Sequence, residues 1–186
     1  MDLFSYFGEG RHLSKEIQEK LSSIFQQVHF SKSEIVLQPD NFNRKLYFIE
    51  CGLARTFYFK GGKEITHFFF REDSFYTPIE CTFYNHNSPY GFEFLTPSDV
   101  RVAYFSELDE LMKEHPELER FTRKILVDFL KLASERLYSL QFQSAQERYK
   151  DLITTYPDIL LQAPLGHVAS YLGITQQTLS VIRGQK

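Results

Sequence analysis

The sequence lacks most of what metal or redox chemistry would need. Its two cysteines, Cys51 and Cys81, cannot hold a four-cysteine iron–sulfur cluster. The six histidines are scattered, and no two of them stand at the spacing of a metal-binding pair. A glycine-rich phosphate loop and a nucleophile elbow are also missing. We therefore expect no metal site, no cofactor and no catalytic residue, which makes an enzyme built on a β-barrel the least favoured interpretation.

The chain also lacks the features of a secreted or membrane protein. No segment approaches the ~20 consecutive apolar residues of a membrane-spanning helix. The N-terminus has no basic region followed by an apolar one. Two cysteines make no disulfide framework, which fits a reducing compartment. The net charge of −3 argues against a protein that binds polyanions over its whole surface. These observations predict a cytoplasmic protein with no membrane partner.

Aromatic residues are abundant, with 19 Phe and 11 Tyr, although there is no Trp. Many of them stand between His29 and Phe105 in short runs of β-branched and aromatic residues, which predict strands. Gly61 and Gly62 predict the turn of a hairpin, and residues 13–27 have the apolar spacing of a helix. Such an arrangement predicts an antiparallel sandwich or a small barrel. The predicted strands cover residues 34–38, 45–49, 53–59, 64–70, 90–94 and 100–105.

A long helix is predicted after the strands, from Pro116 to about Gln141. One apolar face, which includes Ile125 and Phe129, can pack on the strands. A second set of apolar residues has the alternating spacing of a heptad seam, and we expect the same helix of a second copy to cover it. Burial of both faces within one chain is the alternative interpretation. The seam consists of Leu126, Leu130, Ala133, Leu137 and Leu140.

The C-terminal segment, residues 163–186, predicts two short helices joined by a tight turn. Apolar residues repeat at helical spacing over residues 165–172, and Gly173 can end that helix with a positive φ. Thr175 is a natural N-cap for a second helix, whose apolar side carries Leu179. This is the pattern of a DNA-reading helix-turn-helix, and an ordinary helical hairpin is the alternative.

A strand-rich half, a long seamed helix and a helix-turn-helix, in that order, resemble the Crp/Fnr superfamily of transcription regulators. Residues 48–55 look like the family's strand–Gly–strand segment, and residues 62–75 look like the hairpin that leads into its effector pocket. Residues 145–153 and 169–175 are similar to the short, Bacteroidetes-type members. The resemblance therefore covers nearly the whole chain.

The resemblance implies an α+β fold in three parts. Residues 1–115 would form an antiparallel β-roll (a double-stranded β-helix), residues 116–142 a dimerisation helix, and residues 143–186 an all-α helix-turn-helix domain. Many relatives continue into a two-stranded wing, and because this chain stops at Lys186 we expect the wing to be absent. The implied function is a homodimeric, sequence-specific DNA-binding regulator, with a palindromic operator, a second copy and RNA polymerase as partners.

The DNA-facing surface should be the first turns of the second helix of the motif. By position, Gln176, Gln177 and Val181 match the base readers of the family, and Gln can pair with two edges of adenine. The alternative is that the glutamines are ordinary solvated surface residues. The further candidates are Thr178 and Ser180 on the same turns and, for backbone phosphates, Thr175, Ser170 and Arg183.

The effector site departs from the family's cyclic-nucleotide binders. Those members hold the phosphate with an Arg, and the corresponding segments here, residues 75–80 and 85–90, contain none. A phosphodiester buried without a cation is costly, so we expect an effector other than cyclic AMP or cyclic GMP. A flat or apolar ligand, anchored by Glu80, His67 or Arg71, would suit the aromatic lining. The expected lining is Phe68, Phe70, Tyr76, Glu80, Phe83, Tyr90 and Phe92.

Two alternatives remain open at this point. The aromatic side chains can fill the roll themselves and leave no cavity, because protein interiors are close-packed. The whole chain can also be a ligand-sensing or partner-binding module whose DNA binding is weak or vestigial. The expected lack of a wing and the small positive charge of the C-terminal segment favour a sensor or partner-binding module with weak DNA binding.

Overall fold

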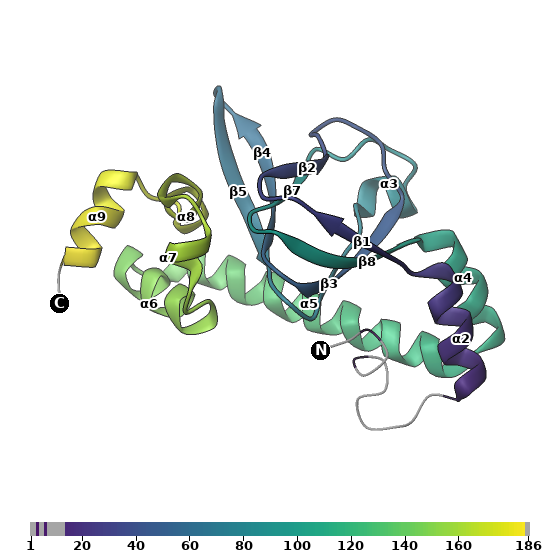
Figure 1. The fold of residues 1–186 in the computed structure, drawn as a ribbon. Helices are drawn as coiled ribbons and strands as arrows, with labels where there is room; N and C mark the ends of the chain where they lie inside the picture. The colour runs from purple at the N-terminus through teal and green to yellow at the C-terminus, as the bar shows by residue number, and fades with distance from the viewer. Residues whose placement is uncertain (1–2, 4–5, 7–13, 185–186) are drawn as a thin grey trace.

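The computed structural model describes Leu3, Tyr6 and residues 14–184, apart from the side chain of Phe121. Two antiparallel four-stranded sheets form a roll in this part of the chain (Figure 1). The first sheet has the order β1 (Gln26–Phe30), β8 (Ser98–Tyr104), β3 (Lys45–Cys51) and β6 (Ser74–Tyr76). The second has the order β2 (Glu34–Leu37), β7 (Gly91–Phe94), β4 (Ala54–Lys60) and β5 (Lys63–Phe70). The predicted α+β fold with an antiparallel roll is confirmed.

Aromatic rings dominate the core between the two sheets. Tyr47 and Tyr76 of the first sheet pack with Phe70, Phe92 and Phe94 of the second. The rings of Tyr76 and Phe92 stack with their centroids 4.0 Å apart, and those of Tyr47 and Phe92 are 5.3 Å apart. Side chains alternate along a strand, so about half of each aromatic run points inward. The interior of the roll is therefore filled by the protein's own side chains.

Two helices cover the outer face of the first sheet, α2 (Lys15–Ile24) and α4 (Phe105–Glu114). Leu21 of α2 and Leu108 of α4 are buried against Phe48, whose side chain points away from the aromatic core. The strand β3 thus separates two apolar layers, one between the sheets and one beneath the helices.

The first helix is shorter than its sequence predicts. The prediction that it continues to residue 27 is wrong, because α2 ends at Ile24 and Gln26 already pairs with Val102 of β8. Hydrogen bonding to a neighbouring strand outweighs a helical spacing that only a few residues carry. Leu13, where the helix was expected to begin, lies outside the described residues.

The second half of the chain is helical. The helix α5 (Pro116–Phe142) has 27 residues and passes beneath the roll in Figure 1, as predicted from the spacing of its apolar residues. Four shorter helices complete the fold, and a capping box of Ser144 and Glu147 begins the first that follows α5. They are α6 (Ala145–Thr155), α7 (Ile159–Gln162), α8 (Leu165–Leu172) and α9 (Gln176–Gly184), while α3 (Ile79–Phe83) lies between β6 and β7.

The helices α6 to α9, which we call the head, share a hydrophobic core with the roll. Phe69 of β5 is buried among Val168 and Leu172 of α8. The hydroxyl of Tyr156 donates a hydrogen bond to the Phe69 carbonyl at 3.0 Å, and Arg71 donates to the carbonyl of Thr155, also at 3.0 Å. In Figure 1 the head lies directly beside β5. Nothing in the sequence pattern predicts this contact.

None of the helices in the described part of the chain has both the length and the hydropathy needed to cross a membrane.

Candidate functional site

The helices α8 and α9 are joined by the tight turn that the sequence predicts. α8 ends at Gly173, whose φ of 68° and ψ of 31° lie in the left-handed region that favours glycine. The Thr175 hydroxyl accepts a hydrogen bond from the Thr178 N–H at 3.1 Å and so caps the N-terminus of α9. On the inner side of α9, Leu179 is fully buried in the core that it shares with α8. The predicted helix-turn-helix structure is therefore present.

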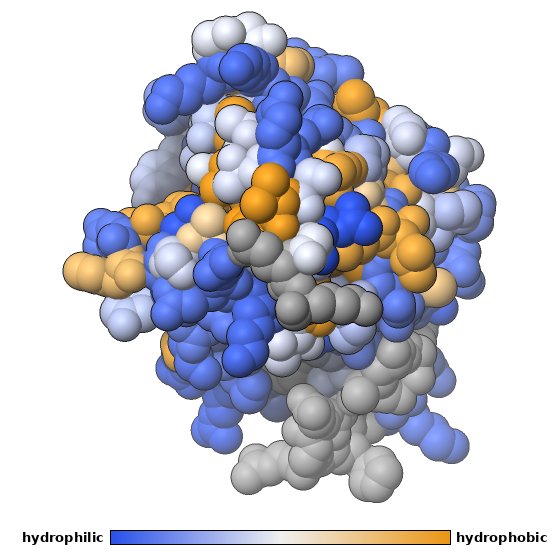
Figure 2. Space-filling model, turned by 90° about the vertical axis from the view of Figure 1, so that its left-hand side faces the viewer, coloured by the Kyte–Doolittle hydropathy of each residue, from blue (hydrophilic) through white to orange (hydrophobic). Residues whose placement is uncertain are grey.

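The outer side of α9 is exposed and mostly polar. Val181 is 59% exposed although it is apolar. The side chain of Gln176 lies over Gly166 of α8, whereas Gln177 points away from the core. Figure 2 looks onto this end of the molecule, where hydrophilic surface surrounds scattered apolar patches. Seven of the predicted DNA contacts are exposed here: Thr175, Gln176, Gln177, Thr178, Ser180, Val181 and Arg183.

Ser170, the remaining predicted contact, lies on α8 and faces the roll. Its hydroxyl accepts a hydrogen bond from the Thr66 N–H of β5 at 3.1 Å and donates to the His167 carbonyl at 3.0 Å. The side chain is half-buried. In this arrangement Ser170 joins the head to the roll and is separate from the exposed face of α9.

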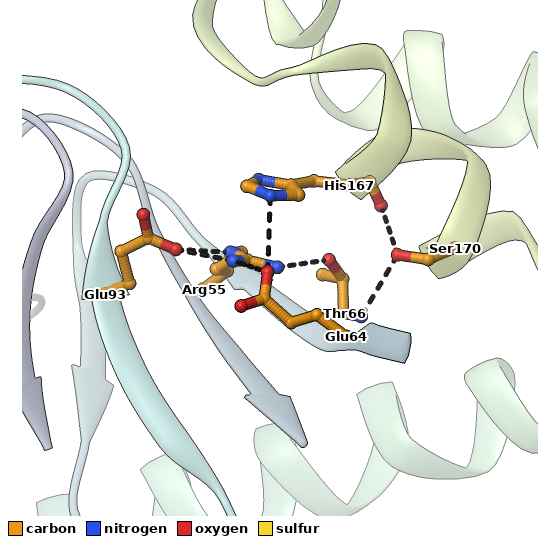
Figure 3. A network of polar contacts seen from close by, with 6 residues as sticks. All are labelled: Arg55, Glu64, Thr66, Glu93, His167 and Ser170. Atoms are coloured by element: carbon orange, nitrogen blue, oxygen red, sulfur yellow. Dashed lines mark hydrogen bonds and ion pairs between the residues drawn. The ribbon is translucent and has the colours of Figure 1, made fainter. Parts of the chain in front are cut away.

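A buried arginine organises the polar contacts beside Ser170 (Figure 3). Arg55 of β4 is 1% exposed. Its Nε donates to the Glu93 carboxylate at 2.7 Å, its Nη1 donates to the Thr66 hydroxyl at 3.0 Å, and its Nη2 forms an ion pair with Glu64. A charge this deeply buried is tolerated only with such partners. We call the six residues drawn in Figure 3 the clasp: Arg55, Glu64, Thr66, Glu93, His167 and Ser170.

His167 connects the head to the carboxylate side of the clasp. Its Nε2 lies 3.4 Å from the nearer Glu64 oxygen, and its Nδ1 is buried without a hydrogen-bond partner. Burial lowers the pKa of His167, and the positive charge of Arg55 lowers it further. A neutral ring with its proton on Nε2 fits these contacts, because a proton on Nδ1 would be an unpaired buried donor. From the sequence alone, Arg55 has no predicted role, and His167 is only a candidate phosphate contact or surface residue.

Two further arginines hold the C-terminal end of α8. Arg136 of α5 donates to the Tyr171 carbonyl and lies over the Tyr171 ring, 3.8 Å from its centroid. Arg148 of α6 donates to the Leu172 carbonyl at 2.9 Å. The last carbonyls of a helix lack partners within it and carry partial negative charge, so two cations are well placed there. The position of α8 therefore depends on α5, on α6 and on the clasp.

A groove of about 1010 Å³ lies between α5 and the roll. The aromatic core fills the inside of the roll, and the open space lies outside it, along α5. Phe92 does not line this space, because it is fully buried behind Tyr76. Arg71 is also absent from the lining, since it binds Thr155 and lies over the Tyr156 ring. The predicted residues that do line the groove are Phe68, Phe70, Tyr76, Glu80, Phe83, Tyr90 and His67.

Solved structures show which fold this arrangement belongs to. FixK2 from Bradyrhizobium japonicum superposes with a TM-score of 0.75 at 17% identity, over 87% of this chain and 84% of that one. A CooA mutant from Carboxydothermus hydrogenoformans gives 0.69 at 19% identity, over 99% and 83%. The catabolite activator protein of Thermus thermophilus gives 0.58 at 18%, over 97% and 85%. The fold is of the Crp/Fnr type. No family model matches the sequence, and no curated protein does either.

In this fold, the segments expected to correspond to the family's phosphate site carry the Glu80 carboxylate and no arginine of their own. Glu80 stands there, with a carboxylate oxygen 3.4 Å from the Ser88 hydroxyl. Arg44 reaches the same region, but it donates to the Cys81 carbonyl at 3.0 Å and to the Asn85 side chain at 2.6 Å. The expectation of an effector other than a cyclic nucleotide stays a prediction.

The predicted seam of α5 is largely uncovered in the single chain. Leu130 is 69% exposed, and Leu126, Leu137 and Leu140 are exposed as well. Ala133 differs, because it packs against the aromatic core of the roll. A row of leucines on α5 is thus left uncovered by the described part of the chain, which argues against burial of both helix faces within one copy.

Proposed function

We propose that the protein is a cytoplasmic, homodimeric, sequence-specific DNA-binding transcription regulator of the Crp/Fnr type, without catalytic activity. The exposed outer face of α9, backed by the buried Leu179, is the observation that carries the proposal. A helix of this kind can enter the major groove of B-DNA, where side chains reach the edges of the bases.

The residues on α9 suggest how bases would be read. Gln177 can pair with two edges of adenine, and the exposed methyl groups of Val181 can contact a thymine methyl. Thr178 and Ser180 lie on the same turns, and Thr175 and Arg183 are placed for backbone phosphates. Gln176 is exposed and leans over α8, whereas a role for Ser170 in DNA contact requires its side chain to leave its hydrogen bond with Thr66.

The second copy would dock on the seam of α5. Four exposed leucines in a row are typical of a helix that pairs with its equivalent across a two-fold axis. Such a dimer presents two α9 helices to successive major grooves and binds a palindromic site with half-sites ~10 base pairs apart. RNA polymerase is a further proposed partner, as in a regulator that acts at promoters.

The groove between α5 and the roll is the proposed effector site. It touches both the helix that carries the seam and the head, because Leu137 of α5 and Tyr171 of α8 are among its lining residues. If a ligand binds more tightly to one arrangement of α5 and the head than to another, it increases the population of molecules in that arrangement. The effector we propose is a small molecule other than a cyclic nucleotide.

A selection from random DNA duplexes, followed by binding measurements at several salt concentrations, tests this function. We expect one palindromic sequence to be bound at least ~10³-fold more tightly than random DNA. Gln177→Ala should relax the preference at one position in each half-site, whereas Gln162→Ala, at an exposed glutamine outside α9, should not. Absence of any preferred sequence would contradict the proposal.

The second candidate is a sensor or partner-binding module with weak DNA binding. The charge balance of the head favours it, because the described part of the head has no excess of basic over acidic side chains. The basic ones are Arg148, Lys150 and Arg183, and the acidic ones are Glu147, Asp151 and Asp158. If this function is correct, binding to every duplex will be weak and will vanish with modest added salt.

A further inference from the structure

We propose that the groove binds a small ligand with a flat, apolar body and one anionic group, and that Arg136 binds the anionic group. This inference rests on the proposed function, which makes the groove the effector site, and it adds the chemical class of the ligand and the residue that senses it.

Arg136 is a half-buried cation without a carboxylate partner among the described residues. Its side chain contacts the carbonyl and the ring of Tyr171, and no Asp or Glu of the described chain lies within 4.0 Å of it. By contrast, Arg55 and Arg101 each form ion pairs. Burial lowers the pKa of Arg136, which reflects the cost of holding its charge away from water. An anion at this position would offset that cost with a charge-assisted hydrogen bond.

The other charges along the groove favour Arg136 as the partner of the anion. Glu119, which also lines the groove, stands seventeen positions before Arg136 on α5, which corresponds to about 25 Å along the helix axis. Arg123 lies one turn from Glu119 and is exposed to solvent. Because Arg123 is hydrated and lies beside the Glu119 carboxylate, an anion gains most from the half-buried Arg136 near α8.

Aromatic side chains next to Arg136 suit a flat, apolar body. His67 stacks on Tyr90 with the centroids 4.4 Å apart and the planes at 10°, and Tyr58 meets both rings edge-on. Burial lowers the pKa of His67 to about 4, and the charge of Arg136 contributes to this shift. At neutral pH the His67 ring is therefore uncharged and acts as an aromatic surface with one N–H donor. Phe68 and Phe129 extend the same wall.

A ligand at this place would act directly on the head. The donors of Arg136 hold the carbonyl of Tyr171 in the last turn of α8, and an anionic oxygen competes for the same donors with a stronger bond. The helix α8 would then keep its contacts with Arg148 of α6 and within the clasp but lose one support from α5. Ligand binding should thus change the affinity for DNA, by about 5- to 150-fold if the coupling is of ordinary size.

Two fluorescent probes of nearly the same shape test the proposal. The first, 8-anilinonaphthalene-1-sulfonate, has a flat aromatic body and one sulfonate, and N-phenyl-1-naphthylamine has the same body without the charge. Arg136→Gln should weaken binding of the sulfonate about tenfold or more and leave binding of the neutral probe unchanged within about twofold. Arg136→Lys should restore most of the sulfonate affinity, and Arg123→Gln, the matched control in the same groove, should have little effect.

The outcomes separate this inference from the proposed function. If Arg136→Gln leaves the sulfonate affinity unchanged, or weakens both probes equally, the inference is overturned, whatever the DNA experiments show. If the probes behave as expected but the protein selects no DNA sequence, the proposed function fails and the anion site stands. Thermal unfolding of each variant, with the far-ultraviolet circular dichroism spectrum, checks that the fold is intact.

Discussion

Arg55 is the residue on which most of the polar contacts between the sheets and the head depend. If Arg55 is replaced by Met, the carboxylate of Glu93 stays buried without its partner. We expect Arg55→Met to lower the free energy of unfolding by about 3–5 kcal/mol, as measured by urea denaturation. The control is Lys113→Met, which removes exposed ion pairs on α4 and should leave the free energy of unfolding nearly unchanged.

A double variant distinguishes the charge of Arg55 from its packing. In Arg55→Met with Glu93→Met both buried charges are gone, so the double variant should be more stable than Arg55→Met alone. Equal or lower stability would mean that Arg55 acts mainly through its contacts with Thr66 and Phe57.

His67 gives the stability a predictable pH dependence. Its pKa in the folded protein is about 4, below the value of about 6.5 expected in the unfolded chain. As the pH falls below 6.5, the unfolded state takes up a proton that the folded state does not, so stability decreases down to about pH 4. Because the ring faces the groove and is partly screened by solvent, we expect a loss of about 2 kcal/mol.

Thermal or urea unfolding between pH 7 and pH 5 measures this effect, above the range in which carboxylates dominate. His67→Gln should reduce the loss of stability over this interval. The same replacement at the exposed His86, which does not line the groove, is the matched control. A loss that is identical in all three proteins would assign the pH dependence to other groups.

At the scale of the element, the exposed seam of α5 decides the oligomeric state. Leu130 is its most exposed leucine. A charge in the middle of an apolar helix pair is unfavourable, so Leu130→Glu should convert a dimer into a monomer, as measured by light scattering. Leu161→Glu makes the same change at a leucine of α7 that is 87% exposed and outside the seam, and it should keep the dimer mass. A dimer that survives Leu130→Glu would place the interface elsewhere.

The elements that the sequence predicts correctly are those with a strong local signal. In α5, apolar residues repeat at helical spacing over many turns. The hairpin of β4 and β5 has Gly61 and Gly62 with positive φ, and α9 is capped by Thr175. The misjudged residues depend on distant partners. Gln26 joins a strand because β8 lies beside it, and Phe105 begins α4 although it continues an alternating pattern. Local spacing carries no information about these contacts.

The candidate site was predictable only in part, for the same reason. Glu80 of α3 and Tyr90, directly before β7, line the groove as expected, since both belong to the roll domain. The sequence pattern suggests no role for Arg136 and only a phosphate contact for Ser170, because the contacts of both arise where α8 meets α5 and β5, which are separate in the sequence. A lone arginine within aromatic strands, as at Arg55, is the one signal that could have pointed to the clasp.

At the scale of the whole molecule, the roll and the head are joined by a shared core. Phe69 is 2% exposed among side chains of both parts, including Leu53 and Leu95 of the roll and Val168 and Leu172 of α8. Its removal leaves a cavity at the junction, so Phe69→Ala should cost about 3–5 kcal/mol. Because the cavity touches α8, the amides of α8 should exchange hydrogen faster, as measured by mass spectrometry.

Phe48→Ala is the matched control for this experiment. Phe48 is equally buried on a strand, but it packs beneath α2 and α4 and not against the head. Its removal should have a similar cost and should speed exchange in α2 and α4 more than in α8. The two variants together test whether the head responds to the roll through Phe69. If α8 exchanges equally fast in both, the head and the roll open as one unit, and a ligand in the groove would have to act through global stability alone.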